Sequence, residues 1–109
     1  MESKEAVTQL AALAHENRLA VFRLLVQNGP NGLCVGDIAA NTGMAPATLS
    51  FHLKELSRSG LLRASPDGRR IFYAPDFKAM NALMAYLLEN CCDGADCGVG
   101  CLPTQDTEA

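Results

Sequence analysis

The sequence lacks any long apolar run. No stretch approaches the roughly 18 consecutive apolar residues that a bilayer-crossing helix requires. The chain also lacks the pattern of a signal peptide, because the first 15 residues carry Glu2, Lys4, Glu5 and His15 and no apolar run follows a basic start. We therefore expect a cytoplasmic protein with no membrane partner.

Histidine is scarce, since His15 and His52 are the only two in the chain. No Ser-His-Asp arrangement, glycine-rich phosphate loop or carboxylate pair indicates catalysis. A thiol enzyme would need a positioned base or a Cys-x-x-Cys motif at a helix N-terminus, whereas the C-terminal cysteines follow a predicted helix, whose dipole disfavours a thiolate. We expect that the protein is not an enzyme; a small thiol reductase or metalloid-transfer protein is the alternative.

Basic residues are absent from the last part of the chain and concentrated in its middle. Residues 79–109 hold five acidic and no basic residues, whereas residues 46–78 hold six basic and three acidic residues, a local net charge of +3. The net charge of −3 for the whole chain hides this segment. Because phosphate responds to the local field, residues 46–78 are a candidate nucleic-acid surface, although an ordinary solvated surface would have the same composition.

Apolar periodicity and turn residues predict a single small domain. The predicted elements are helices over 4–14, 16–28, 35–41 and 46–59, strands over 61–64 and 70–74 joined by a tight turn at 65–69, and a last helix over 77–90. Two short helices joined by a glycine-containing turn, followed by a basic hairpin, predict a mainly α winged helix-turn-helix in the order α-α-α-α-β-β-α. Residues 1–92 would form this domain, and residues 93–109 a flexible tail rich in cysteine and glycine.

The predicted helix over 46–59 has two distinct faces. Leu49, Leu53 and Leu56 fall on one side and should face the core. The opposite side and its flanks carry side chains suited to phosphate, base and thymine-methyl contacts, and the hairpin tip adds two arginines. The candidate DNA-binding residues are Ala47, Thr48, Ser50, Phe51, His52, Lys54, Arg58, Arg69 and Arg70. Phe51 could instead pack under the hairpin, and His52 could pack at the core edge or contact the DNA backbone.

Three segments carry a family resemblance: LAHENRL at residues 13–19, MAPATLSFHLKEL at 44–56 and GLL at 60–62. In these segments the chain resembles the ArsR/SmtB family of metal-responsive repressors, over about residues 5–92. The helix-turn-helix part of the resemblance is specific. It implies a homodimer that binds double-stranded operator DNA and is released when a metal or metalloid binds.

The last predicted helix supports dimerisation. Its apolar residues recur at helical spacing and form a wide stripe, which one small domain has little core left to cover. The resemblance implies that a partner chain covers it, beside the first helix. The candidate interface residues are Val7, Leu10, Phe77, Met80, Leu83, Met84, Leu87 and Leu88. Packing within one chain is the alternative.

Four of the five cysteines lie close together near the C-terminus: Cys91, Cys92, Cys97 and Cys101. In a cytosolic chain such a cluster indicates metal or redox chemistry rather than a disulfide scaffold. Three thiolates without a histidine form a soft ligand set, suited to arsenic(III) or antimony(III), whereas zinc prefers a fourth ligand. We expect the first three cysteines to form the site, with Cys101 available as a further ligand. Thiol redox sensing, another soft metal and an incidental cysteine-rich tail are the alternatives.

The family resemblance also bears on Cys34. Arsenic-sensing members commonly carry a Cys-Val-Cys pair before the recognition helix, and here Gly36 replaces the second cysteine. Other arsenic-responsive members carry a C-terminal Cys-Cys pair and a further cysteine, as this chain does. Zinc-sensing members use Asp and His on the last helix, but residues 76–90 contain no histidine. The resemblance thus implies a C-terminal sensor, with Cys34 most simply a buried small apolar residue.

These patterns together predict a repressor that binds operator DNA as a dimer and is released by arsenic(III) or antimony(III). A repressor of the same fold that senses a thiol oxidant or another soft metal is one alternative. A winged-helix module that binds protein rather than DNA is another.

Overall fold

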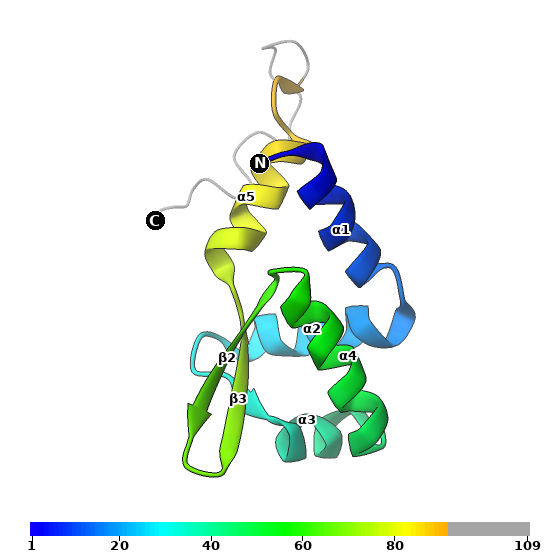
Figure 1. Cartoon of the computed structure of the whole chain (residues 1–109), viewed down its shortest axis with the longest axis vertical. Helices are drawn as coiled ribbons and strands as arrows, with labels where there is room; N and C mark the ends of the chain where they lie inside the picture. The colour runs from blue at the N-terminus through cyan, green and yellow to red at the C-terminus, as the bar shows by residue number, and fades with distance from the viewer. Residues whose placement is uncertain (92–109) are drawn as a thin grey trace.

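The computed structural model describes residues 1–91, which form a winged helix-turn-helix (Figure 1). In chain order the elements are α1 (Ser3–Leu13), α2 (Glu16–Asn28), β1 (Leu33–Cys34), α3 (Val35–Thr42), α4 (Pro46–Arg58), β2 (Leu62–Asp67), β3 (Arg70–Pro75) and α5 (Phe77–Leu87). The predicted fold class is confirmed, with one additional strand, β1. The predicted tail at 93–109 lies outside the described residues. Within residues 1–91, no helix is long and apolar enough to cross a membrane.

Local sequence explains where several helices begin and end. Pro46 occupies the first turn of α4, where its missing N–H has no helical partner. Gly43 follows α3 with a φ of 76°, the left-handed conformation that commonly ends a helix. Asp76 caps α5, because its Oδ1 accepts a hydrogen bond from the backbone N–H of Ala79 at 3.0 Å.

The core forms around one face of α4, as predicted. Leu49, Leu53 and Leu56 are each 0% exposed, and α4 packs against α2, α3 and β2. Burying a leucine side chain of this kind contributes about 1.5–3 kcal/mol. The other large apolar side chains of this core are Val21, Phe22, Leu25, Ile38, Leu61, Leu62 and Leu83. This packing fixes which side of α4 faces outward.

The sheet is antiparallel, with β3 between β1 and β2. The two-residue strand β1 was not predicted; it pairs Leu33 with Tyr73 and Cys34 with Phe72. Gly32 makes this approach possible, because its φ is 84° and a Cβ there would lie 2.8 Å from the carbonyl oxygen of Tyr73. Through β1, the residue preceding α3 is hydrogen-bonded to the hairpin.

The hairpin of β2 and β3, here called the wing (residues 62–75), is longer than predicted. Ser65 and Pro66 were assigned to the turn, but they pair with Phe72 and Ile71 in the sheet. Pro66 is tolerated because β2 is an edge strand. The pairing of Asp67 with Arg70 leaves a loop of only two residues between the strands.

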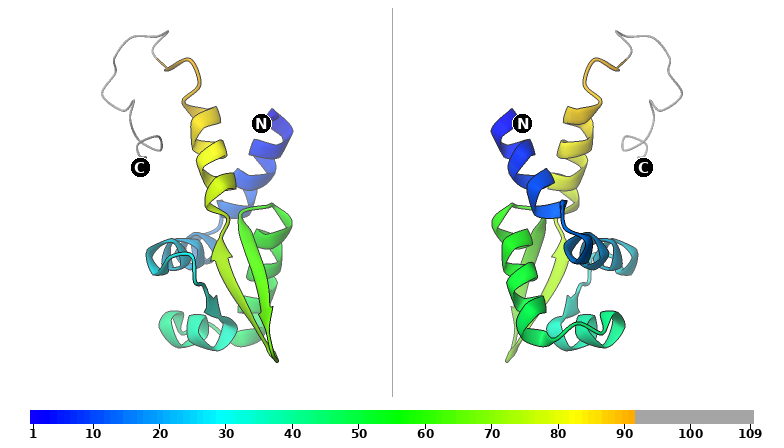
Figure 2. Two further views of the ribbon diagram at one scale, coloured as in Figure 1. Left: turned by 90° about the vertical axis from the view of Figure 1, so that its left-hand side faces the viewer. Right: turned by 90° about the vertical axis from the view of Figure 1, so that its right-hand side faces the viewer.

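The helices α1 and α5 lie side by side and extend away from the rest of the molecule (Figure 2). The wing tip lies at the opposite end (Figure 1). α5 ends at Leu87 rather than at the predicted residue 90. A turn follows, in which Asn90 has a φ of 59° and the N–H of Cys91 donates to the carbonyl of Leu88 at 2.9 Å. The start of α5 is fixed to the body, since the N–H of Asp76 donates to Leu61 O at 2.8 Å.

Candidate DNA-binding surface and cysteine site

The outward side of α4 presents six of the seven predicted DNA-binding residues on this helix. These six, here called the α4 surface, are Ala47, Thr48, Ser50, Phe51, Lys54 and Arg58, and all are exposed. They place two cations, two hydroxyl groups and an aromatic ring on one helix. These groups can bind phosphates and the edges of DNA bases. The structure brings them together because Leu49, Leu53 and Leu56 hold the other side in the core.

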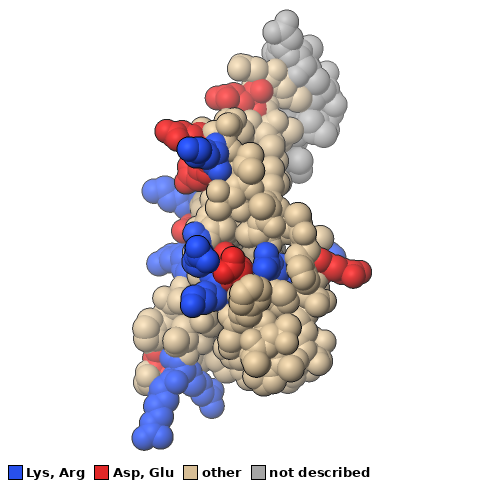
Figure 3. All heavy atoms as spheres, turned by 45° about the vertical axis from the view of Figure 1, so that its right-hand side comes forward, with Lys and Arg blue, Asp and Glu red and all other residues tan. Residues whose placement is uncertain are grey.

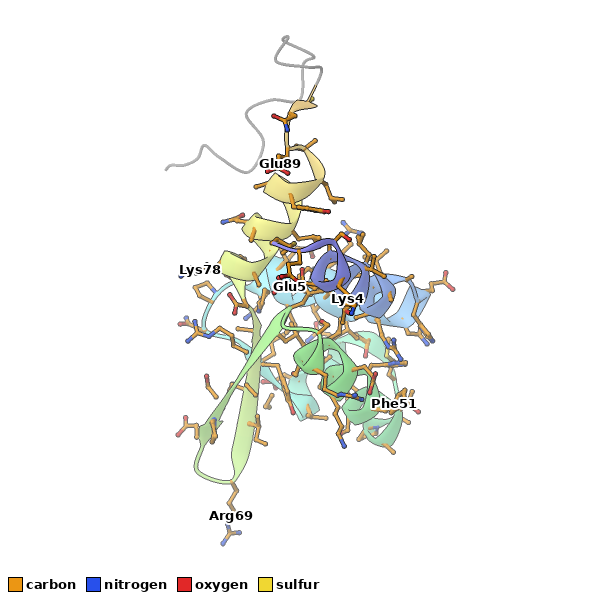
Figure 4. The ribbon with its side chains drawn as sticks, turned by 45° about the horizontal axis from the view of Figure 1, so that its top comes forward. Lys4, Glu5, Phe51, Arg69, Lys78 and Glu89 are labelled. Atoms are coloured by element: carbon orange, nitrogen blue, oxygen red, sulfur yellow. The ribbon has the colours of Figure 1, made fainter. Side chains whose placement is uncertain are left out.

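The wing adds two further cations. Arg69 and Arg70 are exposed at its tip, and Arg69 projects away from the body (Figure 4). A cleft of about 490 Å³ lies between the wing, α3 and α4, and is lined by Ser50, Asp37 and both arginines among others. Through Ser50, the α4 surface therefore meets the wing tip at one open cleft.

Charge on this side of the molecule is mixed. Figure 3 shows Lys and Arg side chains along one side of the view and at its lower end, with Asp and Glu among them. Arg58 Nη1 lies 3.1 Å from Glu55 Oε2, and the two side chains are 71% and 29% exposed. Lys54 is exposed and makes no ion pair within residues 1–91. The cation of Arg58 is thus partly neutralised by its own helix.

His52 is a correction to the predicted DNA-contact set. It is 5% exposed, on the inward side of α4, and its Nδ1 accepts a hydrogen bond from Arg18 Nε at 3.2 Å. Its ring centroid lies 4.8 Å from that of His15. Burial, followed by the charges of His15 and Arg18, lowers the pKa of His52 below its usual 6.5. An imidazole that is buried against Arg18 and His15 has a packing role and presents no edge to a base.

Phe51 is on the surface rather than under the wing. It is 55% exposed and points outward from α4 (Figure 4). The guanidinium carbon of Arg18 lies 5.6 Å from the centroid of its ring, a cation–π geometry. Sequence reasoning missed Arg18, because 34 residues separate it from His52 and no local pattern links them.

Of the cysteines, the structure describes Cys34 and Cys91. Cys34 is buried as predicted, although its Sγ also donates to Asp37 Oδ2 at 3.3 Å. Cys91 is half-buried and lies after the end of α5. Cys92, Cys97 and Cys101 are outside the described residues, and within residues 1–91 no group of three or more His, Cys, Asp or Glu side chains could hold a metal ion. The predicted cysteine site therefore remains a prediction.

The predicted dimer interface divides into three groups. Val7, Leu10 and Leu87 are exposed apolar side chains, at 63%, 41% and 55%. Three residues of α5 and the residue that follows the helix are half-buried: Phe77, Met80, Met84 and Leu88. Leu83 is a correction, because it is 4% exposed and packs in the chain's own core, so it has no surface to offer a partner.

This geometry agrees with the comparisons to known proteins. Residues 13–64 match the family described as a helix-turn-helix domain. The HTH-type transcriptional regulator YgaV of Escherichia coli (strain K12) is 31% identical over 85 residues, which cover 78% of this chain and 84% of YgaV. The homodimeric winged helix-turn-helix DNA-binding domain of Mb0332 from Mycobacterium bovis, described as a possible ArsR-family transcriptional regulator, is 31% identical, with a TM-score of 0.63 over 80% of this chain and 81% of that one.

The chain belongs to the ArsR/SmtB family of transcriptional regulators. Another solved relative is the antimony-specific transcriptional repressor AntR, which is 36% identical, with a TM-score of 0.63 over 79% of this chain and 77% of AntR. Members of this family are DNA-binding regulators and not enzymes. For this ArsR/SmtB chain, the α4 surface and the wing tip are thus the candidate DNA-binding residues.

Proposed function

We propose that the chain is a homodimeric repressor that binds operator DNA through the α4 surface and the wing tip. It leaves the DNA when arsenic(III) or antimony(III) is bound by Cys91, Cys92 and Cys97. One observation carries the DNA-binding part: the exposed α4 surface carries hydroxyl, aromatic and basic side chains, and its Ser50 lines the same cleft as Arg69 and Arg70. In a dimer, two such helices would enter successive major grooves, about 34 Å apart.

Homodimerisation is supported by the unpartnered apolar side chains of α1 and α5. Val7, Leu10 and Leu87 are exposed on the two helices that extend from the body. A second copy of the same surface would bury them in a two-fold interface. The Mycobacterium bovis relative is described as homodimeric, which favours the same arrangement here.

The metalloid part of the proposal follows from thiol chemistry. Cys34 is buried against Asp37, and the position two residues later is Gly36, so this region offers a single thiol. The remaining four cysteines begin at Cys91, directly after the α5 turn. Three thiolates are a donor set that fits a soft trivalent metalloid. AntR, described as antimony-specific, is a relative with this fold, which supports the choice of ligand class.

Binding of the metalloid and binding of operator DNA would each weaken the other. If the metalloid lowers operator affinity by a given factor, operator DNA must lower metalloid affinity by the same factor. Cys91, the first of the proposed ligands, follows the end of α5, one of the two helices proposed to pair, so the dimer interface is the element whose arrangement the metalloid would change.

The DNA-binding proposal is tested by fluorescence anisotropy with a labelled duplex that the wild-type protein selects from a random pool. Replacing Arg58 and Arg69 together by alanine should abolish binding at 0.1 M salt. Arg23→Ala is the matched control, because Arg23 is an exposed cation on α2, a helix that contributes no residue to the α4 surface or the wing tip. Unchanged affinity of the double variant would favour a protein-binding role instead.

The sensing proposal is tested by titrating the complex with arsenite, antimonite, zinc, cadmium and oxidant in parallel. Arsenite or antimonite should release the wild-type protein, and Cys91→Ser and Cys92→Ser should no longer respond. Cys34→Ala is the control and should respond as the wild type does. Release of both serine variants at wild-type metalloid concentrations would contradict the assignment, and release by oxidant alone would indicate a redox sensor.

A further inference from the structure

Arg18, the third residue of α2, reaches from its own helix to the recognition helix. Its Nε donates to Nδ1 of the buried His52 at 3.2 Å, and its guanidinium carbon lies 5.6 Å from the centre of the exposed Phe51 ring. One side chain of α2 is therefore held at two points by α4. Both contacts therefore join α4 to a helix outside the helix-turn-helix pair, which consists of α3 and α4.

These contacts leave most N–H donors of the Arg18 guanidinium without a hydrogen-bond partner among the described residues. An arginine has five N–H donors, and the contact with His52 uses one of them. The structure gives the two terminal amino groups of Arg18 no hydrogen bond or ion pair to any other described residue. The residue is half-buried, and it lines an open groove on the surface. The guanidinium also lies beside Phe51, one of the residues of the α4 surface.

We propose that Arg18 is a DNA-contacting residue, which binds a backbone phosphate at the edge of the α4 surface. Guanidinium groups match phosphate oxygens in geometry and stay charged at all working pH values. Because His52 and Phe51 already hold the side chain, less conformational entropy is lost when it binds. Arg18 also lines one groove, of about 390 Å³, together with Arg58 and Glu55 of α4, so the two cations lie along the same flank of the helix and share it with one carboxylate.

A purely structural role for Arg18 is the competing explanation, because its bond to His52 also ties α2 to α4. The two roles differ in their response to salt. A phosphate contact releases counterions, so each one contributes about −0.9 to the slope of log K against log [salt] and roughly tenfold to affinity at 0.1 M salt. A positioning role lowers affinity without changing that slope.

This inference rests on the proposed DNA binding and is tested with the same selected duplex at several KCl concentrations. Arg18→Met removes the charge but keeps an unbranched stem over Phe51, and Arg18→Lys keeps the charge. The slope should become less steep by about 1.8 per dimer in the methionine variant and stay close to wild type in the lysine variant. Arg23→Ala removes one charge from another side of α2 and should leave the slope unchanged.

Circular dichroism and sedimentation check that each variant folds and dimerises as the wild type does. The inference is overturned if Arg18→Met keeps the wild-type slope, if Arg23→Ala lowers the slope equally, or if Arg18→Met loses DNA binding only because it no longer dimerises. A wild-type protein that selects no duplex would instead refute the proposed function, and this inference with it.

Discussion

Replacing Glu55 by glutamine should make this protein bind DNA more tightly. The carboxylate of Glu55 accepts a hydrogen bond from Arg58 Nη1 at 3.1 Å, three residues further along α4. Arg58 is one of the predicted phosphate contacts, and its cation must leave Glu55 before it can bind a phosphate fully. If Arg58 binds a phosphate, wild-type binding therefore includes the cost of breaking this ion pair.

The size of the effect follows from the geometry of the pair. The Arg58 side chain is 71% exposed, so solvent and salt screen the attraction. Pairs at this spacing on an exposed helix contribute about 0.2–0.5 kcal/mol each. A dimer contains two of them, so their removal should strengthen binding by about 0.4–1 kcal/mol, or about two- to fivefold in Kd. The free energy of unfolding should fall by no more than the contribution of the pair.

Fluorescence anisotropy at 0.1 M salt measures a change of this size. Glu89→Gln is the control, because it removes the same charge beyond the end of α5, far from α4 (Figure 4). A double-mutant cycle with Arg58→Ala isolates the pair, since the gain from Glu55→Gln should disappear when Arg58 is absent. The reasoning is refuted if Glu55→Gln binds no more tightly than wild type, or if Glu89→Gln produces an equal gain through net charge alone.

Three further predictions concern stability, measured by urea unfolding. Gly32→Ala should destabilise the fold and separate β1 from β3, because the φ of 84° is strained for alanine and the new Cβ would lie 2.8 Å from Tyr73 O; Gly68→Ala at the open wing tip is the comparison for φ strain alone. Asp76→Ala should cost about 1 kcal/mol, because it removes the cap of α5, while Asp76→Asn should retain most of it. For His52, the lowered pKa means that the unfolded chain binds more protons than the folded one as pH falls below about 6.5. Stability should therefore be fully present above pH 6.5 and decline below it, with a steeper decline than in His52→Gln; equal slopes would contradict this.

Periodicity predicted the helices well because their apolar faces pack against one core. The bounds of α2 agree with the predicted 16–28, and Pro46 and Asp76 marked the starts of α4 and α5. The two-residue strand β1 is too short to show alternation, and only its pairing with β3 defines it. The end of α5 also had no local signal, since apolar residues continue to Leu88 although the helix stops at Leu87.

The α4 surface was predictable in part, because helical spacing shows which residues of one helix share a side. Helical projection separated the buried leucines of α4 from the exposed Lys54 and Arg58, because both sets lie on one element. It placed Phe51 on the outward side without deciding between DNA contact and packing under the hairpin, and it placed His52 near the edge of the core, where its role stayed open. Their positions depend on Arg18 and His15, which tertiary packing brings from another part of the chain. A contact over 34 residues has no signature in periodicity.

The hydrogen bond from Asp76 to Leu61 O has a mechanical consequence. It anchors the start of α5 to the turn after α4, directly beside Pro75, the last residue of the wing. α5 has 11 residues and β3 has six, so their lengths are about 16 Å and about 20 Å. With a rigid joint, a shift of about 2 Å at the far end of α5 would turn it by about 7° and move the wing tip by about 2 Å. The joint would act as a pivot, and the displacement at Arg69 would be more than half of the roughly 3.4 Å rise along the helix axis that corresponds to one phosphate of a DNA strand.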